Sequence, residues 1–326
     1  MSIVPTTFDP DDVRFFSGLS NKALAGEIAA HLGVPLEETN FSKFSNDNLF
    51  IQLGASVRGR KVYIVQSLTT PVSDNLLSLL MMIDIAKSAA AKEIHAIIPY
   101  FSYARSDKKD APRISITARL VADLLKTAGA THVMTMTLHS PQVHGFFSVP
   151  TDPITARMLF LEYLQKRDLN PATHVVVSPD MGRAESASRF ANDLGLNVAT
   201  ASKTRISDTK VKIGGLIKRQ IEGFKYALIY DDEIATGGSV VELSKYLIAN
   251  GIETVTLICT HGLFLGDALE RIAAIPQIVE IITTDTVHRT KEDTPDNMHI
   301  ISVAEPFAEA IRCNYLHQSI GPLFDI

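Results

Sequence analysis

The sequence contains only two cysteines and carries no excess of positive charge. Cys259 and Cys313 lie far apart and neither belongs to a Cys-x-x-Cys pair, so a disulfide framework and a thiolate metal site are not expected. Lysine and arginine together number 31 against 36 acidic residues, giving a formal net charge of −5, whereas a broad nucleic-acid-binding surface usually needs the opposite balance. These scarcities predict a protein of the reducing cytoplasm with no nucleic-acid partner.

Long apolar runs are also missing. The most apolar stretch, Leu76–Ala86, is interrupted by Ser78 and Asp84 and is shorter than the roughly 20 residues that a membrane-spanning helix needs. The first residues, MSIVPTTFDPDDV, are acidic where a secretory signal is basic. The sequence therefore predicts neither a membrane span nor a signal peptide.

The chain has 326 residues, 46% of them hydrophobic and 21% charged, which is typical of a globular protein with one or two domains. Short β-branched or aromatic runs alternate with segments whose apolar residues recur at helical spacing. This alternation predicts an α/β fold with mostly parallel sheets flanked by helices. The expected strands are Lys61–Val65, Glu93–Ile98, His132–Met136, His174–Val177, Tyr226–Tyr230, Thr254–Cys259 and Val279–Thr283. The expected helices are Asn75–Ala91, Ser115–Thr127, Ala184–Leu194, Ser239–Ala249 and Asp267–Ala274.

A domain boundary is expected near the middle of the chain. Ser148–Thr155, SVPTDPIT, carries two prolines and no clear periodicity, so we place the boundary there, between residues 1–150 and residues 151–326. Near the end, Met298–Val303 and Ala304–Arg312 predict one more strand and helix. These last residues could pack on either domain, and the N-terminal domain is our prediction.

The most informative stretch is Tyr226–Glu242, YALIYDDEIATGGSVVE, in which an apolar strand ends in two acids and a Thr-Gly-Gly-Ser turn opens a helix. Such a turn directs several backbone N–H groups and the positive end of the helix dipole at one point, which suits a phosphate monoester. The two glycines allow close approach of the backbone, and Thr236 and Ser239 add hydroxyl donors. Asp231 and Asp232 can hold sugar hydroxyls or a hydrated Mg2+. These residues predict a sugar-phosphate site.

This strand, acidic pair and loop resemble the fingerprint of the phosphoribosyltransferase-fold superfamily. Further segments resemble one of its families, the ribose-phosphate diphosphokinases or PRPP synthetases, over nearly the whole chain. The resemblance implies two phosphoribosyltransferase-like domains, the first with the ATP loop and subunit contacts and the second with the ribose 5-phosphate loop. The segments, in family order, are Ser56–Ser67, Pro99–Asp110, Met134–Phe147, Val176–Arg183, Thr260–Ile272 and Ile301–Arg312.

The resemblance also implies a reaction. The β,γ-diphosphoryl group of ATP moves to the C1 hydroxyl of ribose 5-phosphate, giving PRPP and AMP, with Mg2+ as cofactor. A homo-oligomer built from dimers, up to a hexamer, is implied as well, because in this family a neighbouring subunit completes the ATP site. Lys203 and Arg205, in ASKTR, match the family's catalytic Lys-x-Arg pair, which stabilises negative charge on the transferred group.

Other residues match the family's binding positions. His139 and Asp180 match positions associated with Mg2+; imidazole is a poor Mg2+ ligand, so His139 is expected to act through coordinated water or on the ATP phosphates. Arg58 matches a position of the allosteric phosphate or ADP site. The ATP-binding positions, in which the aromatic ring stacks on adenine, are matched by Phe44, Asn46, Asn48, Arg105, Ser106, Asp107 and His139. The ribose 5-phosphate positions are matched by Arg205, Asp231, Asp232, Ala235, Thr236, Gly237, Gly238 and Ser239.

Several positions depart from the family pattern. Ala235 and Thr137 each stand where the family has an aspartate, and Asn48 stands where it has a glutamate. Arg183 replaces a glycine beside the pyrophosphate loop, and Ser106 replaces a glutamine. Loss of carboxylates affects hydroxyl and Mg2+ binding more than phosphate binding, so these changes bear on substrate affinity and metal dependence rather than on the fold.

The allosteric site also departs from the pattern. Arg58 is kept, but Pro141 replaces a serine, His144 replaces a glutamine, and Ser319–Gly321 replaces a Ser-Val-Ser-like stretch. The sequence therefore predicts weak or absent activation by inorganic phosphate and weak inhibition by ADP at this site.

Three other functions stay open. The chain could be a catalytically impaired relative that regulates an active homologue, or a diphosphokinase acting on a different sugar phosphate. It could also be a salvage phosphoribosyltransferase that consumes PRPP, although that reading leaves the YARSDKK and SVRG segments without a role.

Overall fold

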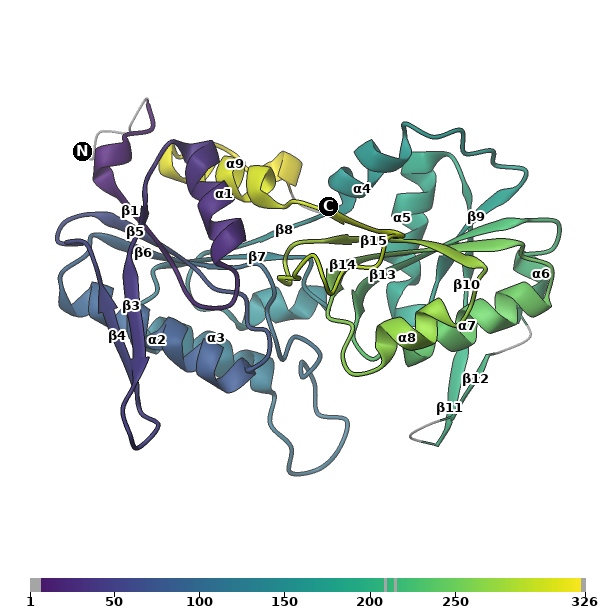
Figure 1. Cartoon of the computed structure of the whole chain (residues 1–326), viewed down its shortest axis with the longest axis horizontal. Coiled ribbons are helices and arrows are strands. Elements are labelled where there is room, and N and C mark those ends of the chain that lie inside the picture. Colours follow the sequence, from purple (N-terminus) through teal and green to yellow (C-terminus); the bar gives the residue numbers. More distant parts are fainter. Residues whose placement is uncertain (1–6, 208–209, 214–215, 324–326) are drawn as a thin grey trace. The chain divides into compact units, whose positions relative to one another are not determined.

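The computed structural model describes residues 7–207, 210–213 and 216–323, and the side chains of residues 203–216 and 322 lie outside this description. The chain forms two compact units. The first comprises the described residues up to Thr155, together with Thr286–His288 and the described residues from Ser302 onward. The second comprises Ala156–Asp285 and Arg289–Ile301. Each unit contains a six-stranded parallel sheet, which confirms the predicted α/β fold (Figure 1).

The sheet of the first unit has the strand order β2-β1-β5-β6-β7-β8. Val62 and Ile64 of β5 pack with Leu79 of α2 and Val121 of α3 in the core on one face. Helices α1 and α9 lie on the other face (Figure 1). Because both faces are covered, the strands are apolar runs rather than strict alternations. The bounds are β1 Val13–Ser17, α1 Lys22–Leu32, β2 Leu36–Glu37, β5 Lys61–Val65, α2 Val72–Ser88, β6 Glu93–Ile98, α3 Thr117–Ala128, β7 His132–Met136, β8 Thr151–Ile154 and α9 Ala304–Tyr315.

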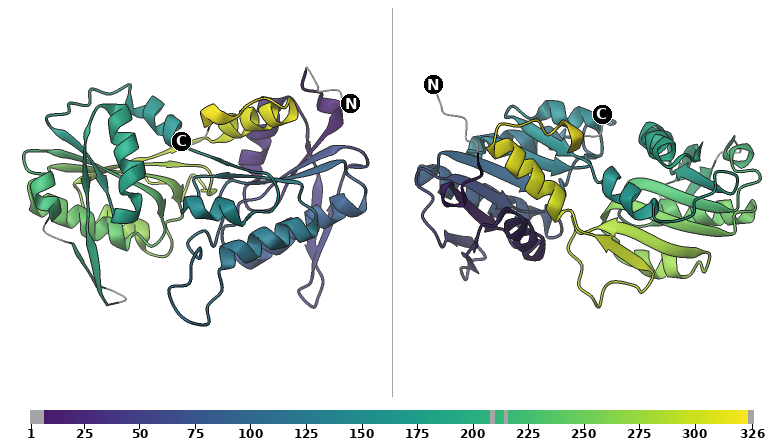
Figure 2. Two further views of the ribbon diagram at one scale, coloured as in Figure 1. Left: turned by 180° about the vertical axis from the view of Figure 1, so that it is seen from behind. Right: turned by 90° about the horizontal axis from the view of Figure 1, so that it is seen from above.

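Helix α9 belongs to the first unit although it lies near the end of the chain. Figures 1 and 2 show it beside α1. The guanidinium of Arg312 donates to the carbonyl of His31 in the last turn of α1 at 3.1 Å, and the hydroxyl of Tyr315 donates to the carboxylate of Asp12 at 3.3 Å. These contacts join the end of the sequence to its beginning.

A row of buried polar side chains crosses the first sheet on the face away from α2 and α3. The parallel register places Tyr63 beside His95 and His95 beside His132, on β5, β6 and β7. The Tyr63 ring is stacked on the His95 imidazole with centroids 4.3 Å apart. The Nδ1 atoms of the two histidines lie 3.2 Å apart, and the outer nitrogens reach Glu93 at 3.2 Å and Asp152 at 2.8 Å. Burial lowers the pKa of His95 to about 4, although Glu93 acts in the opposite direction.

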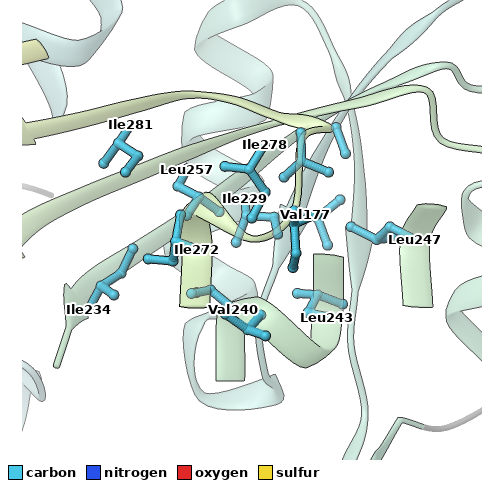
Figure 3. Close-up of a cluster of buried hydrophobic side chains, with 14 of the residues drawn as sticks. Val177, Ile229, Ile234, Val240, Leu243, Leu247, Leu257, Ile272, Ile278 and Ile281 are labelled. Carbon is cyan, nitrogen blue, oxygen red and sulfur yellow. The ribbon is translucent and has the colours of Figure 1, made fainter. Parts of the chain in front are cut away.

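The sheet of the second unit has the order β10-β9-β13-β14-β15-β16. On one face Val177 and Ile229 pack with Leu243 of α7 (Figure 3). On the other, the ring of Tyr230 is stacked on that of Phe190 in α5 with centroids 4.2 Å apart. The bounds are α4 Arg157–Leu164, β9 His174–Ser178, α5 Ala184–Leu194, β10 Asn197–Thr200, α6 Leu216–Gln220, β13 Tyr226–Ile234, α7 Gly238–Ala249, β14 Thr254–Gly262, α8 Ala268–Ala273, β15 Ile278–Thr284 and β16 Met298–Ile301.

Two antiparallel hairpins stand apart from these sheets. The first unit contains β3 Thr39–Lys43 paired with β4 Leu49–Leu53, and the second contains β11 Lys203–Ser207 paired with β12 Lys210–Ile213. Within the described ranges, no helix is long and apolar enough to cross a membrane.

Two details of the predicted secondary structure are wrong. Ser148–Thr155 is not irregular, because Thr151–Ile154 forms β8. Pro153 is accommodated since β8 is the edge strand of its sheet, where a missing N–H donor need not break a ladder. The strand expected to end at Tyr230 continues to Ile234, because β14 runs beside it as far as Gly262.

Candidate active site

The turn that is predicted to bind phosphate joins a strand to a helix, as expected. Strand β13 ends at Ile234, and α7 begins at Gly238 with Gly237 as its N-terminal cap. Gly237 has a φ of 72°, in the left-handed region that favours glycine. Thr236 and Ser239 are exposed beside it. The backbone N–H groups of the first turn of α7 and these two hydroxyls can therefore meet a phosphate group.

We expect Gly237→Ala to weaken the binding of ribose 5-phosphate about tenfold. A non-glycine residue in the left-handed region costs about 1–2 kcal/mol, and relief of this strain would move the N–H groups of the turn. Isothermal titration of the full chain would measure the change. Gly251→Ala is the matched control, because Gly251 also has positive φ, 104°, but lies after the far end of α7. Equal affinities for the two variants would contradict a role for the turn.

Asp231 and Asp232 lie just before this turn, within the extended end of β13. Both carboxylates are nearly buried, with 13% and 3% of their side chains exposed. The backbone N–H of Asp232 donates to the Asp231 carboxylate at 2.9 Å. Burial raises the pKa of Asp231 well above its usual range, the adjacent Asp232 raises it further, and Arg183 acts in the opposite direction. The pair therefore needs positive charge or hydrogen-bond donors around it.

Arg183 provides positive charge to this pair. Its guanidinium forms an ion pair with the carboxylate of Asp232, and its Nε lies 4.0 Å from the carboxylate of Asp231. The turn that carries it, Met181–Arg183, is capped by Asp180, whose side chain accepts from the backbone N–H of Arg183 at 3.2 Å. Strands β9 and β13 are parallel neighbours, so the segments that follow them meet at one edge of the sheet.

Sequence reasoning missed a second arginine. Arg271 of α8 donates through its guanidinium to the backbone carbonyl of Thr236 and pairs with Asp267 at 3.0 Å. Arg271 therefore contacts the backbone of the turn through the carbonyl of Thr236. The spacing of Asp267 and Arg271, four residues apart in a predicted helix, was the available signal, but nothing in it pointed toward the turn.

In the first unit, the predicted adenine-binding residues lie together in the turn of the β3–β4 hairpin. Phe44 is 58% exposed, and its ring meets that of Phe50 edge-on with centroids 5.8 Å apart. The backbone N–H of Phe44 donates to the carbonyl of Asn48 at 2.9 Å, and the Asn46 side chain accepts from the Asn48 N–H at 3.2 Å. An exposed, supported aromatic ring is suited to stacking on a base.

Arg105, Ser106 and Asp107 follow β6 at the start of a long loop. The Ser106 hydroxyl lies 3.2 Å from the carbonyl of Ser115 and 3.3 Å from the hydroxyl of Thr117 at the start of α3. Ser106 thus closes the base of the loop. Arg105 is exposed, and Asp107 is partly exposed.

His139 and Arg58 lie elsewhere in the first unit. His139 is partly exposed and follows β7, after Thr137, which has a φ of 43°. Arg58 is exposed in the turn between β4 and β5. In the second unit, the backbone of Lys203 and Arg205 lies on β11, while their side chains are outside the described part of the structure.

The residues around β13 could hold a divalent cation only together with ligands from a bound substrate. No group of three or more His, Cys, Asp or Glu side chains in the described parts of the chain is arranged to hold a metal ion. Asp231 and Asp232 nonetheless offer the hard oxygen donors that Mg2+ prefers, and Mg2+ commonly uses one or two carboxylates together with substrate phosphates. The acidic pair has donors of this kind, but the guanidinium of Arg183 already lies against them.

Comparisons with known proteins cover almost the entire chain. Residues 13–129 match the N-terminal domain of ribose phosphate pyrophosphokinase, and residues 217–325 match the phosphoribosyl synthetase-associated domain. A Streptomyces coelicolor relative is 48% identical over 96% of this chain and 98% of its own length. The ribose-phosphate pyrophosphokinase of Deinococcus radiodurans is 45% identical over 95% of this chain and 97% of its own. The crystal structure of phosphoribosylpyrophosphate synthetase from Mycobacterium smegmatis matches 94% of this chain and 99% of that one, with 34% identity and a TM-score of 0.86.

Proposed function

The chain belongs to the ribose-phosphate pyrophosphokinase family, and we propose that it transfers the diphosphoryl group of ATP to the C1 hydroxyl of ribose 5-phosphate. The observation that carries this proposal is the turn at Gly237, which joins an acidic strand end to a helix N-terminus. A phosphate group suits the turn, and hydroxyl groups suit the adjacent carboxylates. Ribose 5-phosphate carries a phosphate group at one end and hydroxyl groups on its ring.

In the proposed reaction the C1 hydroxyl oxygen forms a bond to the β-phosphorus of ATP. The bond from that phosphorus to the oxygen bridging the α- and β-phosphates breaks, AMP leaves, and the hydroxyl proton is released. Lys203 and Arg205 are assigned by the family resemblance to stabilise charge on the transferred group. Thr236, Ser239 and the turn backbone hold the 5-phosphate, and Asp231 and Asp232 accept from sugar hydroxyls.

ATP binding is assigned to the first unit. Phe44 stacks on adenine with Asn46 and Asn48 beside it, and Arg105 reaches the phosphates. The family resemblance associates His139, acting through water, and Asp180 with Mg2+, which would neutralise phosphate charge when bound. We further propose a dimer-based homo-oligomer in the cytoplasm.

Formation of AMP and PRPP by the purified protein tests the function. ATP and Mg2+ are supplied with ribose 5-phosphate present or omitted, and both products are quantified. Equal amounts of AMP and PRPP, formed only with the sugar, are expected. Hydrolysis of ATP without sugar dependence would contradict the proposal. If the folded protein forms AMP with another sugar phosphate but not with ribose 5-phosphate, that other sugar phosphate is the substrate. If it forms AMP only after a homologue is added, the chain is a regulatory subunit.

Inorganic phosphate should change this activity little. Pro141 begins the short 3-10 helix Pro141–Phe146, and proline has neither the hydroxyl nor the N–H of the serine usual in the family. His144 is already engaged, since its Nε2 lies 3.1 Å from the carbonyl of Thr151. A phosphate titration at saturating substrates checks this expectation. Strong, saturable activation that is lost in Arg58→Ala would overturn it.

A further inference from the structure

The acidic pair of the sugar-phosphate site already has a cation of its own. Arg183 forms the ion pair with Asp232 and approaches Asp231, and only 13% of its side chain is exposed. Its position is set by the short turn Met181–Arg183, which Asp180 caps. The guanidinium is therefore held against the two carboxylates by the local backbone rather than reaching them from a distant surface.

We propose that Arg183 is a specificity-determining residue of this site, which supplies internally the counter-charge that the Asp231–Asp232 pair would otherwise take from a divalent cation. The inference deepens the proposed function and relies on it for the identity of the sugar phosphate. Its consequence is that ribose 5-phosphate binds to this site with little dependence on Mg2+.

The charges of the second unit favour this arrangement. Two adjacent carboxylates in a nearly buried position repel each other, and a fixed guanidinium offsets that repulsion. Ala235 adds no further carboxylate where the family has an aspartate, and Arg183 offsets one of the two charges of Asp231 and Asp232, so these three side chains carry one net negative charge instead of two. This lower negative charge attracts Mg2+ less strongly than the bare acidic pair would, and it repels the phosphate of the sugar less.

Arg183 need not leave for the sugar to bind. Each ionised carboxylate can accept about four hydrogen bonds. Asp231 is the more exposed of the two carboxylates; it accepts from the backbone N–H of Asp232 at 2.9 Å, and the guanidinium lies farther from it, with its Nε at 4.0 Å. Sugar hydroxyls can therefore approach Asp231 while the arginine stays on Asp232, whereas a divalent cation would place a second positive charge beside the guanidinium. Arg183 thus competes with Mg2+ and tolerates the sugar.

Ribose 5-phosphate binding by the full chain, measured by isothermal titration without ATP, tests the proposal. The titration is made in EDTA and in millimolar Mg2+ for the wild-type protein, Arg183→Ala, Arg183→Lys and Arg189→Ala. Arg189 is the matched control because it lies on α5, following the same turn, and pairs with Glu185 at 2.7 Å. In parallel, the thermal midpoint of each protein is recorded with MgCl2 alone.

The wild-type protein and Arg189→Ala should bind the sugar with affinities that differ less than about threefold between EDTA and Mg2+. Arg183→Ala should bind the sugar about tenfold or more weakly in EDTA, because its acidic pair has lost the guanidinium that pairs with it. Its affinity should recover in Mg2+, because the cation can replace that positive charge. Arg183→Lys should fall between them, because it keeps the charge without the planar fork. MgCl2 alone should raise the thermal midpoint of Arg183→Ala more than that of the wild-type protein.

Two results would overturn the role of Arg183. One is equal Mg2+ dependence of Arg183→Ala and the wild-type protein; the other is tighter sugar binding by Arg183→Ala in EDTA, which would make the arginine a block. A wild-type protein that binds no ribose 5-phosphate in either buffer would instead contradict the proposed substrate. The thermal midpoints measured with MgCl2 alone would then test the role of Arg183. Equal increases for the wild-type protein and Arg183→Ala would show that Arg183 does not replace a divalent cation.

Discussion

Replacing Lys203 by alanine is expected to lower sugar-dependent AMP formation about 1,000-fold, because the transferred diphosphoryl group gains negative charge that a fixed cation stabilises. The family resemblance assigns Lys203 to this role. The loss should appear mainly in kcat, since the contact strengthens in the transition state. Initial rates of AMP formation at saturating ATP and ribose 5-phosphate measure it.

Lys218→Ala is the matched control, because Lys218 is an exposed residue of α6 in the same unit. It should retain the wild-type rate. The affinity of Lys203→Ala for ribose 5-phosphate should remain within a few-fold of the wild-type value, which separates a catalytic role from a binding role. A rate reduced less than about tenfold would remove Lys203 from the catalytic pair.

The second large effect concerns acid stability. His95 is buried and stays neutral in the folded protein until the pH approaches its lowered pKa of about 4, whereas the unfolded chain takes up the proton near the usual value of 6.5. Between these values the unfolded state binds more protons, so stability falls as the pH falls. From pH 7 to pH 4.5 the loss attributable to His95 should be roughly 2.5 kcal/mol.

Urea denaturation of the wild-type protein and His95→Gln at pH 7 and pH 4.5 measures this contribution. Glutamine can still donate to Glu93 but has no proton to gain in this range. The variant should therefore lose roughly 2.5 kcal/mol less than the wild-type protein between the two pH values. His288→Gln replaces an exposed histidine and should follow the wild-type profile. Parallel losses in the wild-type protein and His95→Gln would exclude His95 as the source.

The sequence predicted most interior strands of the two sheets, but it missed the interior strand β1, Val13–Ser17, and several strands at the margins. Central strands such as Lys61–Val65 are continuous apolar runs, and their bounds agree with the structure. The edge strand Thr151–Ile154 was missed, because Pro153 and a short length hide its pattern. Hairpin Thr39–Leu53 was missed because neither strand alternates strictly between buried and exposed residues.

The candidate site also has a part that the sequence predicted and a part that it did not. The turn at Gly237 could be predicted because its function depends on local backbone geometry that a few residues encode. The contacts of Arg183 and Arg271 could not, since each joins segments far apart in the sequence. Arg183 stood out as a departure from the family pattern, but only the parallel pairing of β9 with β13 places it on the acidic pair.

The docking of α9 on α1 has a consequence for synthesis of the chain. The N-terminal sheet and α1 emerge from the ribosome long before Ala304–Tyr315, separated by roughly 150 residues that belong mostly to the second unit. At usual elongation rates this interval lasts about 8 to 30 s. Throughout it the nascent first unit lacks one of its covering helices, so its packing is completed only after Ala304–Tyr315 has been synthesised, and most of the second unit is made before that.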